Sequence, residues 1–215
     1  CLAQCVNPGV PVLPSASLTY GNLQNATWEC ASPESALMLG AAVQMYKEYY
    51  HLPARAQTGV TSSKCVDYQV GYETMQSLLV TALMDVDVTS QSAGSLDNLM
   101  TISFEKTVID DEVISRVRRI LRGLDTDEES YGIDAIMEVP HGDNFLVHDT
   151  TLDNFMDSWK VSISDWNNYE TWNERQYKDI ELRAQKKVEE ILRDAKQILD
   201  PGTQKELAEY IKKFE

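Results

Sequence analysis

Residues that form disulfides or bind metals are scarce in this sequence. The 215 residues include 4 cysteines and 3 histidines. Neither set has the close spacing of a zinc site or of a disulfide framework. We therefore expect reduced thiols, a cytoplasmic protein and no metal centre. The residues concerned are Cys1, Cys5, Cys30, Cys65, His51, His141 and His148.

Long apolar runs and an excess of basic residues are also missing. No run approaches the roughly 18 apolar residues of a membrane span. The 34 acidic residues outnumber the 19 basic ones, which gives a formal net charge of −15. Such a charge repels phosphate backbones and anionic lipid surfaces, so we expect neither nucleic-acid nor membrane binding. It mildly favours cationic ligands, although solubility alone also accounts for it.

The first residues have the pattern of a helix end. Residues 1–6 fit the last turns of a helix, and Pro8-Gly9 is typical of a helix terminus. A chain that begins inside a helix is expected to be a fragment. Part of the core and of the active site would then lie upstream.

Residues 1–124 alternate short strand patterns with helical patterns. Strands are predicted at 10–13, 54–58 and 87–90, and helices at 32–50, 67–84 and 105–121. This alternation is typical of parallel βα units in an α/β fold. It fits the last third or half of a (β/α)8 barrel (TIM barrel) and equally a doubly wound sheet, and periodicity does not choose between them. In either fold the polar segments that follow the strands converge at one rim.

Residues 125–215 predict a helical C-terminal extension that packs on the barrel. A capping box formed by Thr126 and Glu129 favours a short helix that ends near residue 138. Another short helix is predicted from Thr150. A continuous amphipathic helix is expected at 172–198, and a last helix from Thr203.

The loop after the first predicted strand carries Tyr20, Trp28 and Glu29. Two aromatic rings with a carboxylate can bind a trimethylammonium group, because its diffuse charge is attracted to ring faces. The alternative is a surface loop in which Trp28 packs for stability.

The second and third loops carry further candidates. Lys64 fits a Schiff-base amine or an anion-binding group, or a simple ion pair with Asp67, which can also cap the following helix. The small residues at 90–95 allow a large group to approach the backbone, or two loops to pack closely. His148 stands next to Asp149, which suits acid–base work or a structural hydrogen bond.

Five segments, in this order and spacing, resemble the trimethylamine methyltransferase family from about Pro8 to Trp159. They are Pro8-Gly9-Val10-Pro11-Val12; Thr61-Ser62-Ser63-Lys64 with Asp67, Gln69 and Gly71-Tyr72-Glu73; Ser90-Gln91-Ser92-Ala93-Gly94; Ile109-Asp110-Asp111-Glu112 with Arg118-Arg119-Ile120-Leu121-Arg122-Gly123; and Phe145-Leu146-Val147-His148-Asp149-Thr150 with Leu152.

The resemblance implies the C-terminal part of a (β/α)8 barrel and a methyltransferase. In this family a methyl group moves from trimethylamine, or from a related methylated amine or betaine, to the Co(I) form of a corrinoid. The corrinoid, a cobalamin-type cofactor, is carried by a separate partner protein and is not bound covalently by the enzyme. The oligomeric state, including a homo-oligomer, stays open.

The resemblance and the loop chemistry together give a set of candidate site residues. Lys64 and Gln91 are the catalytic candidates, with Gln91 close to the reacting methyl group or to the corrinoid. The substrate-binding candidates are Tyr20, Trp28, Glu29, Gln69, Tyr72 and His148.

Two departures from the family pattern leave the substrate open. Many members that use quaternary amines have a histidine near Ala93-Gly94, where this chain has Ser90 and Gln91. The trimethylamine enzymes of methanogens contain pyrrolysine, which is an acylated lysine, and Lys64 is the natural position for it. Two other functions also remain: a barrel lyase or aldolase with Lys64 as a Schiff-base amine, and a non-catalytic fragment that binds a corrinoid protein.

Overall fold

A computed structural model describes residues 2–128, 130–175, 179–195 and 199–213. Three parallel strands form its main sheet, in the order β1-β4-β5. Short antiparallel hairpins, β2-β3 and β6-β7, form two further sheets. The strands are β1 (Ser15–Ala16), β2 (Tyr20–Asn22), β3 (Thr27–Glu29), β4 (Arg55–Gln57), β5 (Val88–Ser90), β6 (Ser95–Leu96) and β7 (Thr101–Ile102).

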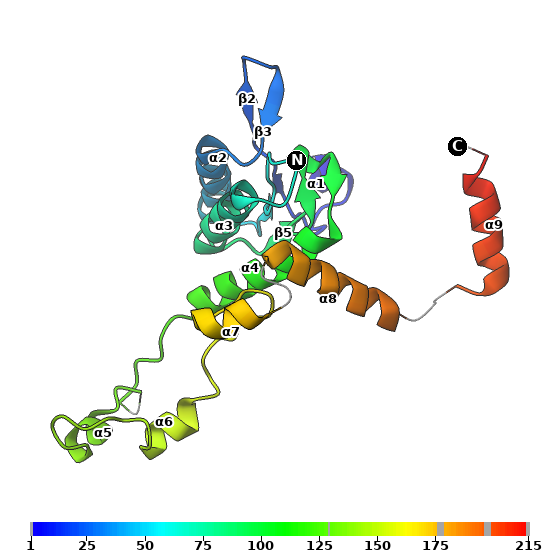
Figure 1. The fold of residues 1–215 in the computed structure, drawn as a ribbon. Helices are drawn as coiled ribbons and strands as arrows, with labels where there is room; N and C mark the ends of the chain where they lie inside the picture. Colours follow the sequence, from blue (N-terminus) through cyan, green and yellow to red (C-terminus); the bar gives the residue numbers. More distant parts are fainter. Residues whose placement is uncertain (1, 129, 176–178, 196–198, 214–215) are drawn as a thin grey trace.

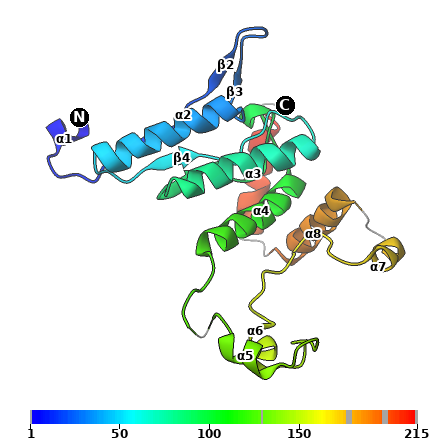
Figure 2. The same ribbon diagram turned by 90° about the vertical axis from the view of Figure 1, so that its left-hand side faces the viewer.

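Helices cover one face of this sheet and continue into the C-terminal part (Figures 1 and 2). The helix α4 packs against both α3 and α8. The helices are α1 (Leu2–Val6), α2 (Pro33–Gln44), α3 (Tyr68–Leu83), α4 (Phe104–Arg122), α5 (Ile133–Glu138), α6 (Asp149–Asn154), α7 (Tyr169–Glu174), α8 (Ile180–Asp194) and α9 (Pro201–Ile211), with a π-helical turn η1 (Met45–Tyr49) and a short turn η2 (Asp97–Leu99).

The predicted βα repeat is confirmed, but a closed barrel is not observed in the described part of the chain. Ala16 pairs with Ala56, which in turn pairs with Thr89, all in parallel register. A sheet of three short strands is open at both edges.

The core lies between the sheet and α2. Ala16, Ala54 and Ala56 are buried against Leu39 and Val43 of that helix. Small alanine side chains on the strands let the helix approach the sheet closely. The helix starts where the sequence predicts it, because the Ser32 side chain accepts a hydrogen bond from Ser35 N, and proline occupies the first helical position.

The structure departs from three expectations for the first 50 residues. The first strand lies at β1 and not at 10–13, because prolines 11 and 14 have no N–H to donate, and pairing starts where Arg55 N donates to Pro14 O at 2.9 Å. The polar segment that was expected to be a loop contains the β2-β3 hairpin. The predicted helix 32–50 changes to a π-helical turn after Gln44.

The C-terminal helices also differ from expectation. The predicted capping box does not start a helix at Thr126, because α5 begins after Gly132; its other member, Glu129, lies outside the described residues. The continuous helix expected at 172–198 is two helices, α7 and α8, because Arg175 is extended and Asp179 caps a new start. Residues 176–178 and 196–198 of that predicted helix lie outside the described residues.

Only part of the C-terminal segment lies on the α/β body. The helix α8 lies along α4, whereas α5 and α6 stand at the end of an arm, and α9 lies apart on the other side (Figure 1). The junction is held by the Glu112 carboxylate, which accepts hydrogen bonds from Ile163 N at 2.6 Å and from Ser164 N at 3.0 Å. The position of a domain boundary near residue 124 stays a prediction.

Candidate functional site

Loops from three parts of the chain meet beyond the carboxyl end of β4. Ser62 Oγ lies 2.8 Å from Glu29 Oε2 and 3.1 Å from Asn98 Oδ1, so its hydroxyl can donate to either oxygen. Asn98 Oδ1 also accepts from Cys30 N at 3.4 Å. The end of the β2-β3 hairpin, the loop after β4 and the turn after β6 are thus joined by side-chain contacts.

The loop after β4 is held to α3 by Glu73. Its Oε2 accepts from Thr61 Oγ1 at 2.5 Å and from Ser62 N at 2.8 Å, while its Oε1 accepts from Gln69 Nε2 at 2.9 Å. The predicted substrate residue Gln69 therefore orders this loop through Glu73. The loop residues themselves are well buried, as Thr61 and Ser63 show.

Lys64 stands at the exposed side of this loop. Its Nζ forms an ion pair with Asp97 Oδ1 at 3.2 Å and donates to Ser62 O at 2.7 Å, and its side chain is 71% exposed. Asp67, the alternative partner, instead caps α3 by accepting from Val70 N at 3.2 Å. Lys64 therefore connects the loop after β4 to the turn η2.

Three consecutive residues of that turn have left-handed backbone angles. The φ values are 47° at Asp97, 50° at Asn98 and 78° at Leu99. Two backbone hydrogen bonds hold them, from Asp97 N to Ser63 O at 2.8 Å and from Asn98 N to Thr61 O at 2.9 Å. Strained backbone of this kind is concentrated at functional sites, which supports a role for this end of the sheet.

Gln91 follows β5 directly and is exposed. It too has a positive φ, 58°. The residue after it, Ser92, lies 2.9 Å from Thr58 through their hydroxyl oxygens. Gln91 thus borders the loop after β4, and the second catalytic candidate lies at the same end of the sheet as Lys64.

Small residues in the loops after β4 and β5 serve close packing. A Cβ added to Gly59 would overlap the carbonyl oxygen of Ser92, and one added to Gly94 would overlap the side chain of Thr107. Both glycines also have positive φ. These contacts favour loop packing, one of the two explanations considered for the small residues at 90–95.

A buried ion pair under these two loops was missed by sequence reasoning. Lys106 and Asp110 pair one turn apart on α4, and both side chains are essentially inaccessible. Lys106 Nζ donates to Gly59 O at 3.1 Å, and Asp110 Oδ2 accepts from Gly94 N at 2.8 Å. Burial raises the pKa of Asp110, although the nearby Lys106 opposes that shift. The pair fixes both loops to the same helix.

The β2-β3 hairpin divides the predicted aromatic wall between its two faces. Tyr20 is paired with Glu29, whereas Trp28 is paired with Gly21. Because neighbouring residues of a strand point to opposite faces, Trp28 faces away from Tyr20 and Glu29. Tyr20 N is anchored to Ser35 Oγ at 2.9 Å. The structure therefore brings Tyr20 and Glu29 together and separates Trp28 from them.

The last two predicted site residues, Tyr72 and His148, do not join the cluster of strand-end loops. Tyr72 is on α3 and is 63% exposed. His148 lies on the arm, where its Nδ1 accepts from Thr150 N at 3.2 Å and its Nε2 lies 3.3 Å from Glu138 Oε2. His148 thus caps α6, far from the strand ends (Figure 1). Its position agrees with the structural role considered for it.

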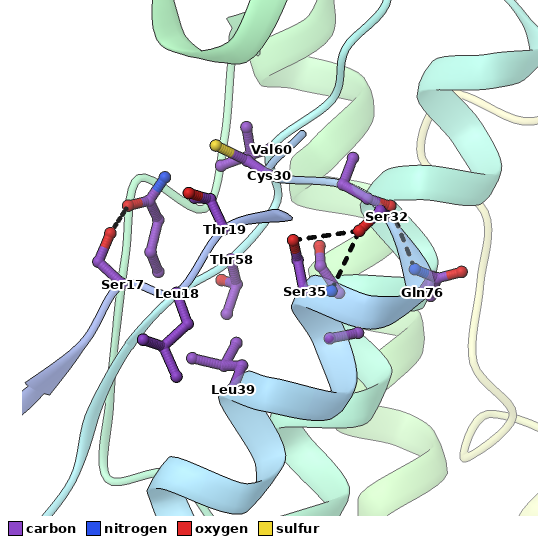
Figure 3. A pocket seen from close by; sticks show the side chains of 14 residues that line it. Ser17, Leu18, Thr19, Cys30, Ser32, Ser35, Leu39, Thr58, Val60 and Gln76 are labelled. Atoms are coloured by element: carbon purple, nitrogen blue, oxygen red, sulfur yellow. Dashed lines mark hydrogen bonds between the residues drawn. The ribbon is translucent and has the colours of Figure 1, made fainter. Parts of the chain in front are cut away.

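A narrow pocket lies beside the cluster, between the ends of β1 and β4 and the helices α2 and α3 (Figure 3). Its lining is neutral and includes Thr58, Cys30 and Gln76, which donates to Ala31 O at 3.2 Å. Burial raises the pKa of the Cys30 thiol, and the charge of Glu29 raises it further, so this thiol is a poor nucleophile. The pocket has room for about one water molecule.

No helix among the described residues has the length and apolar character needed to cross a lipid bilayer. No three His, Cys, Asp or Glu side chains within the described ranges are grouped so as to hold a metal ion.

The parallel βα units and the joined strand-end loops define an α/β protein with a candidate site at one end of its sheet. The chain belongs to the trimethylamine methyltransferase (MTTB) family, whose sequence profile matches residues 1–215. This match covers the segments on which the resemblance rests.

Relatives in this family carry two different substrate names. A glycine betaine methyltransferase of Desulfitobacterium hafniense (strain Y51) is 31% identical over 212 residues, which are 98% of this chain and 44% of the relative. The trimethylamine methyltransferase MttB of Methanosarcina barkeri (strain Fusaro) is 31% identical over 193 residues, 90% of this chain and 39% of the relative. The chain thus spans about two fifths of the length of these relatives.

Proposed function

We propose that this chain is part of a methyltransferase that transfers a methyl group from trimethylamine, or from a related methylated amine or betaine, to the corrinoid of a partner protein. The family match over the whole chain carries this proposal. The cluster of strand-end loops supports it, because it supplies polar groups where enzymes with parallel βα units bind their substrates.

The proposal includes a barrel. Residues 1–124 would form the C-terminal part of a (β/α)8 barrel, and residues 125–215 a helical extension that packs on it. Three parallel strands with helices on one face support this, since parallel sheets are normally covered on both faces, and on the second face Ser15 and Val88 are exposed in this chain.

In the proposed site, Glu29 and Tyr20 bind the substrate ammonium group, and Lys64 and Gln91 border the reacting methyl group. A carboxylate and an aromatic ring on one hairpin face suit a cation with no N–H to donate. Gln69 positions the loop after β4, and Tyr72 lines the outer rim. Trp28 faces the other side of the hairpin, and His148 is on the arm, so neither is included.

The loop after β5 suits the approach of a large group from outside. Between Ser90 and Ser95 the only long side chain is Gln91, which is exposed. The reduced corrinoid of the partner supplies a strong nucleophile that accepts the methyl carbon, while the amine nitrogen keeps the electron pair of the broken N–C bond. The task of this chain is to orient the donor and to exclude water.

Methyl transfer by the complete protein tests the proposal. We expect trimethylamine or glycine betaine to methylate cob(I)alamin, followed by visible absorbance. Gln91→Ala and Lys64→Ala should each lower the rate about tenfold or more, whereas Lys187→Ala on α8, a matched change of an exposed lysine, should not. Unchanged rates in both site variants would dismiss these two residues, and no transfer from any methylated amine or betaine would dismiss the reaction.

The geometry of Lys64 disfavours the Schiff-base alternative. A lysine that forms an imine is usually held in a desolvated pocket, whereas Lys64 is exposed and paired with Asp97. Borohydride trapping with a carbonyl substrate separates the two reactions, because methyl transfer needs no imine. That pyrrolysine is encoded at position 64 stays a hypothesis, and the gene sequence would decide it.

A further inference from the structure

The uncovered face of the main sheet is polar. Ala56 points to the helices, so its neighbours Arg55 and Gln57 point to the opposite face. Two hydrogen bonds place side chains of β1 and of the residue after it there as well: Arg55 Nη1 donates to Ser15 Oγ at 3.1 Å, and Ser17 Oγ donates to Gln57 Oε1 at 2.7 Å. In the proposed barrel, these residues would line the interior.

Arg55 is a half-buried cation on this face. Its register neighbours are Ser15 on β1 and Val88 on β5, and neither carries a charge. No ion pair between described residues includes Arg55. A guanidinium stays charged at all physiological pH values, and a partly desolvated one is stabilised by a carboxylate.

We propose that Arg55 binds the carboxylate of the methyl donor, so that this site selects a betaine over trimethylamine. The inference rests on the proposed function, since it names the substrate class of the same site. Arg55 can hold a carboxylate by two parallel N–H···O bonds, a geometry that lysine does not reproduce. A bare trimethylammonium ion has no group to offer Arg55 and would be repelled by it.

The direction of the strand agrees with this orientation. Gln57 lies two residues nearer the carboxyl end of β4 than Arg55, which is roughly 6.5 Å along the strand. In glycine betaine one carbon separates the carboxylate from the quaternary nitrogen. With its carboxylate at Arg55, we place the N-methyl groups towards Gln57 and the strand ends. This is the end at which Glu29, Lys64 and Gln91 lie.

Binding measurements on the complete protein test this assignment without the corrinoid. Isothermal titration with glycine betaine and with trimethylamine gives both dissociation constants. We expect the wild type to bind glycine betaine at least about tenfold more tightly. Arg55→Gln should weaken glycine betaine binding about 10- to 100-fold, the range expected for a charged hydrogen bond, and leave trimethylamine binding unchanged or improved. Arg55→Lys should weaken glycine betaine binding less than Arg55→Gln does.

Arg118→Gln, which changes an exposed arginine of α4, is the matched control. The inference is overturned if the wild type binds trimethylamine as tightly as glycine betaine, a result that does not depend on the folding of any variant. The inference is also overturned if Arg55→Gln weakens the binding of both ligands equally, or of neither. Selective betaine binding without methyl transfer would instead contradict the proposed function and leave Arg55 as a carboxylate-binding residue.

Discussion

Gly59 shows at the residue scale how tightly the strand-end loops are packed. An added Cβ would overlap the backbone of Ser92, which cannot rotate away. We expect Gly59→Ala to destabilise the protein by about 2 kcal/mol or more, because the positive φ and the overlap both disfavour alanine. Gly71→Ala is the control: nothing lies within 4 Å of its added Cβ, and in a helix it should stabilise by about 0.5–1 kcal/mol. Chemical denaturation measures both, and equal effects would contradict the packing argument.

Glu112 links a single carboxylate to stability at low pH. Burial by itself raises its pKa, but hydrogen bonds from Ile163 N, from Ser164 and from Arg116 outweigh burial and hold the pKa far below its ordinary value. A carboxyl with a lowered folded-state pKa stabilises the fold above its unfolded pKa, about 4.3, and loses that contribution as the pH falls below it.

We therefore expect the wild type to lose stability progressively below about pH 4.3. Glu112→Gln should lower the free energy of unfolding by about 3 kcal/mol at pH 7, and the stability of the variant should depend less on pH in the acidic range. Tryptophan fluorescence is a suitable probe, because Arg116 lies 4.4 Å from the ring centroid of Trp159 and 5.8 Å from that of Trp166. If the stability of the variant falls with decreasing pH as that of the wild type does, Glu112 does not hold the junction between α4 and the segment before α7.

Local residue roles could be predicted from the sequence, and long-range ones could not. Ser32 and Asp67 each cap the helix that begins at the next residue by accepting from a backbone N–H three residues ahead, so their roles depend on neighbours in the sequence. The partners of Lys106 and Asp110 at Gly59 and Gly94 are 47 and 16 residues away. No periodicity indicates such a contact, and the segment that contains Asp110 was noted only through its resemblance to a family.

At the scale of the element, α4 connects the strand-end loops to the C-terminal helices. Lys106 and Asp110 face the loops, while Glu112 and Arg116 face the segment before α7. We expect Lys106→Met and Asp110→Leu each to destabilise by about 3–5 kcal/mol, since each leaves one buried charge unpaired. The double variant should cost clearly less than the sum. A double-mutant cycle by denaturation measures the difference, and additive costs would contradict a coupled pair.

Strands and helices were predictable where one pattern dominated. The strands at 54–58 and 87–90 and the helices at 67–84 and 105–121 lie within two residues of the prediction. The predicted helix 172–198 was wrong, because an amphipathic stripe continues past a break in the backbone. At that break, Asp179 supplies a new N-terminal cap that the stripe does not reveal.

At the scale of the whole molecule, the arm that carries α5 and α6 exposes large apolar side chains. Met137, Leu146 and Val147 are 74–82% exposed, and surfaces of this kind are usually covered by other protein. We expect the isolated chain to have a molar mass above 24.3 kDa in light scattering, with association that increases with concentration. Replacing Leu146 and Val147 together by aspartate should reduce this association.

The control for that change is the pair Thr126→Asp and Ser130→Asp, which adds the same charge to the same arm without removing apolar surface. If both double variants reduce association equally, charge repulsion is the cause and the apolar surface is not.

The sequence predicted helices in this region but not an arm. Helical periodicity describes one element, whereas the position of an arm depends on contacts with the rest of the molecule.

The inaccessible ammonium group of Lys106 has a practical consequence for following motions of this protein. Acylating reagents modify lysines in proportion to their access to water, so Lys64 would react at once and Lys106 only when α4 separates from the loops above it. Mass spectrometry of the labelled peptides would then time that separation from a single natural side chain, with no dye or spin label introduced. Donor molecules that tighten the strand ends would slow the labelling.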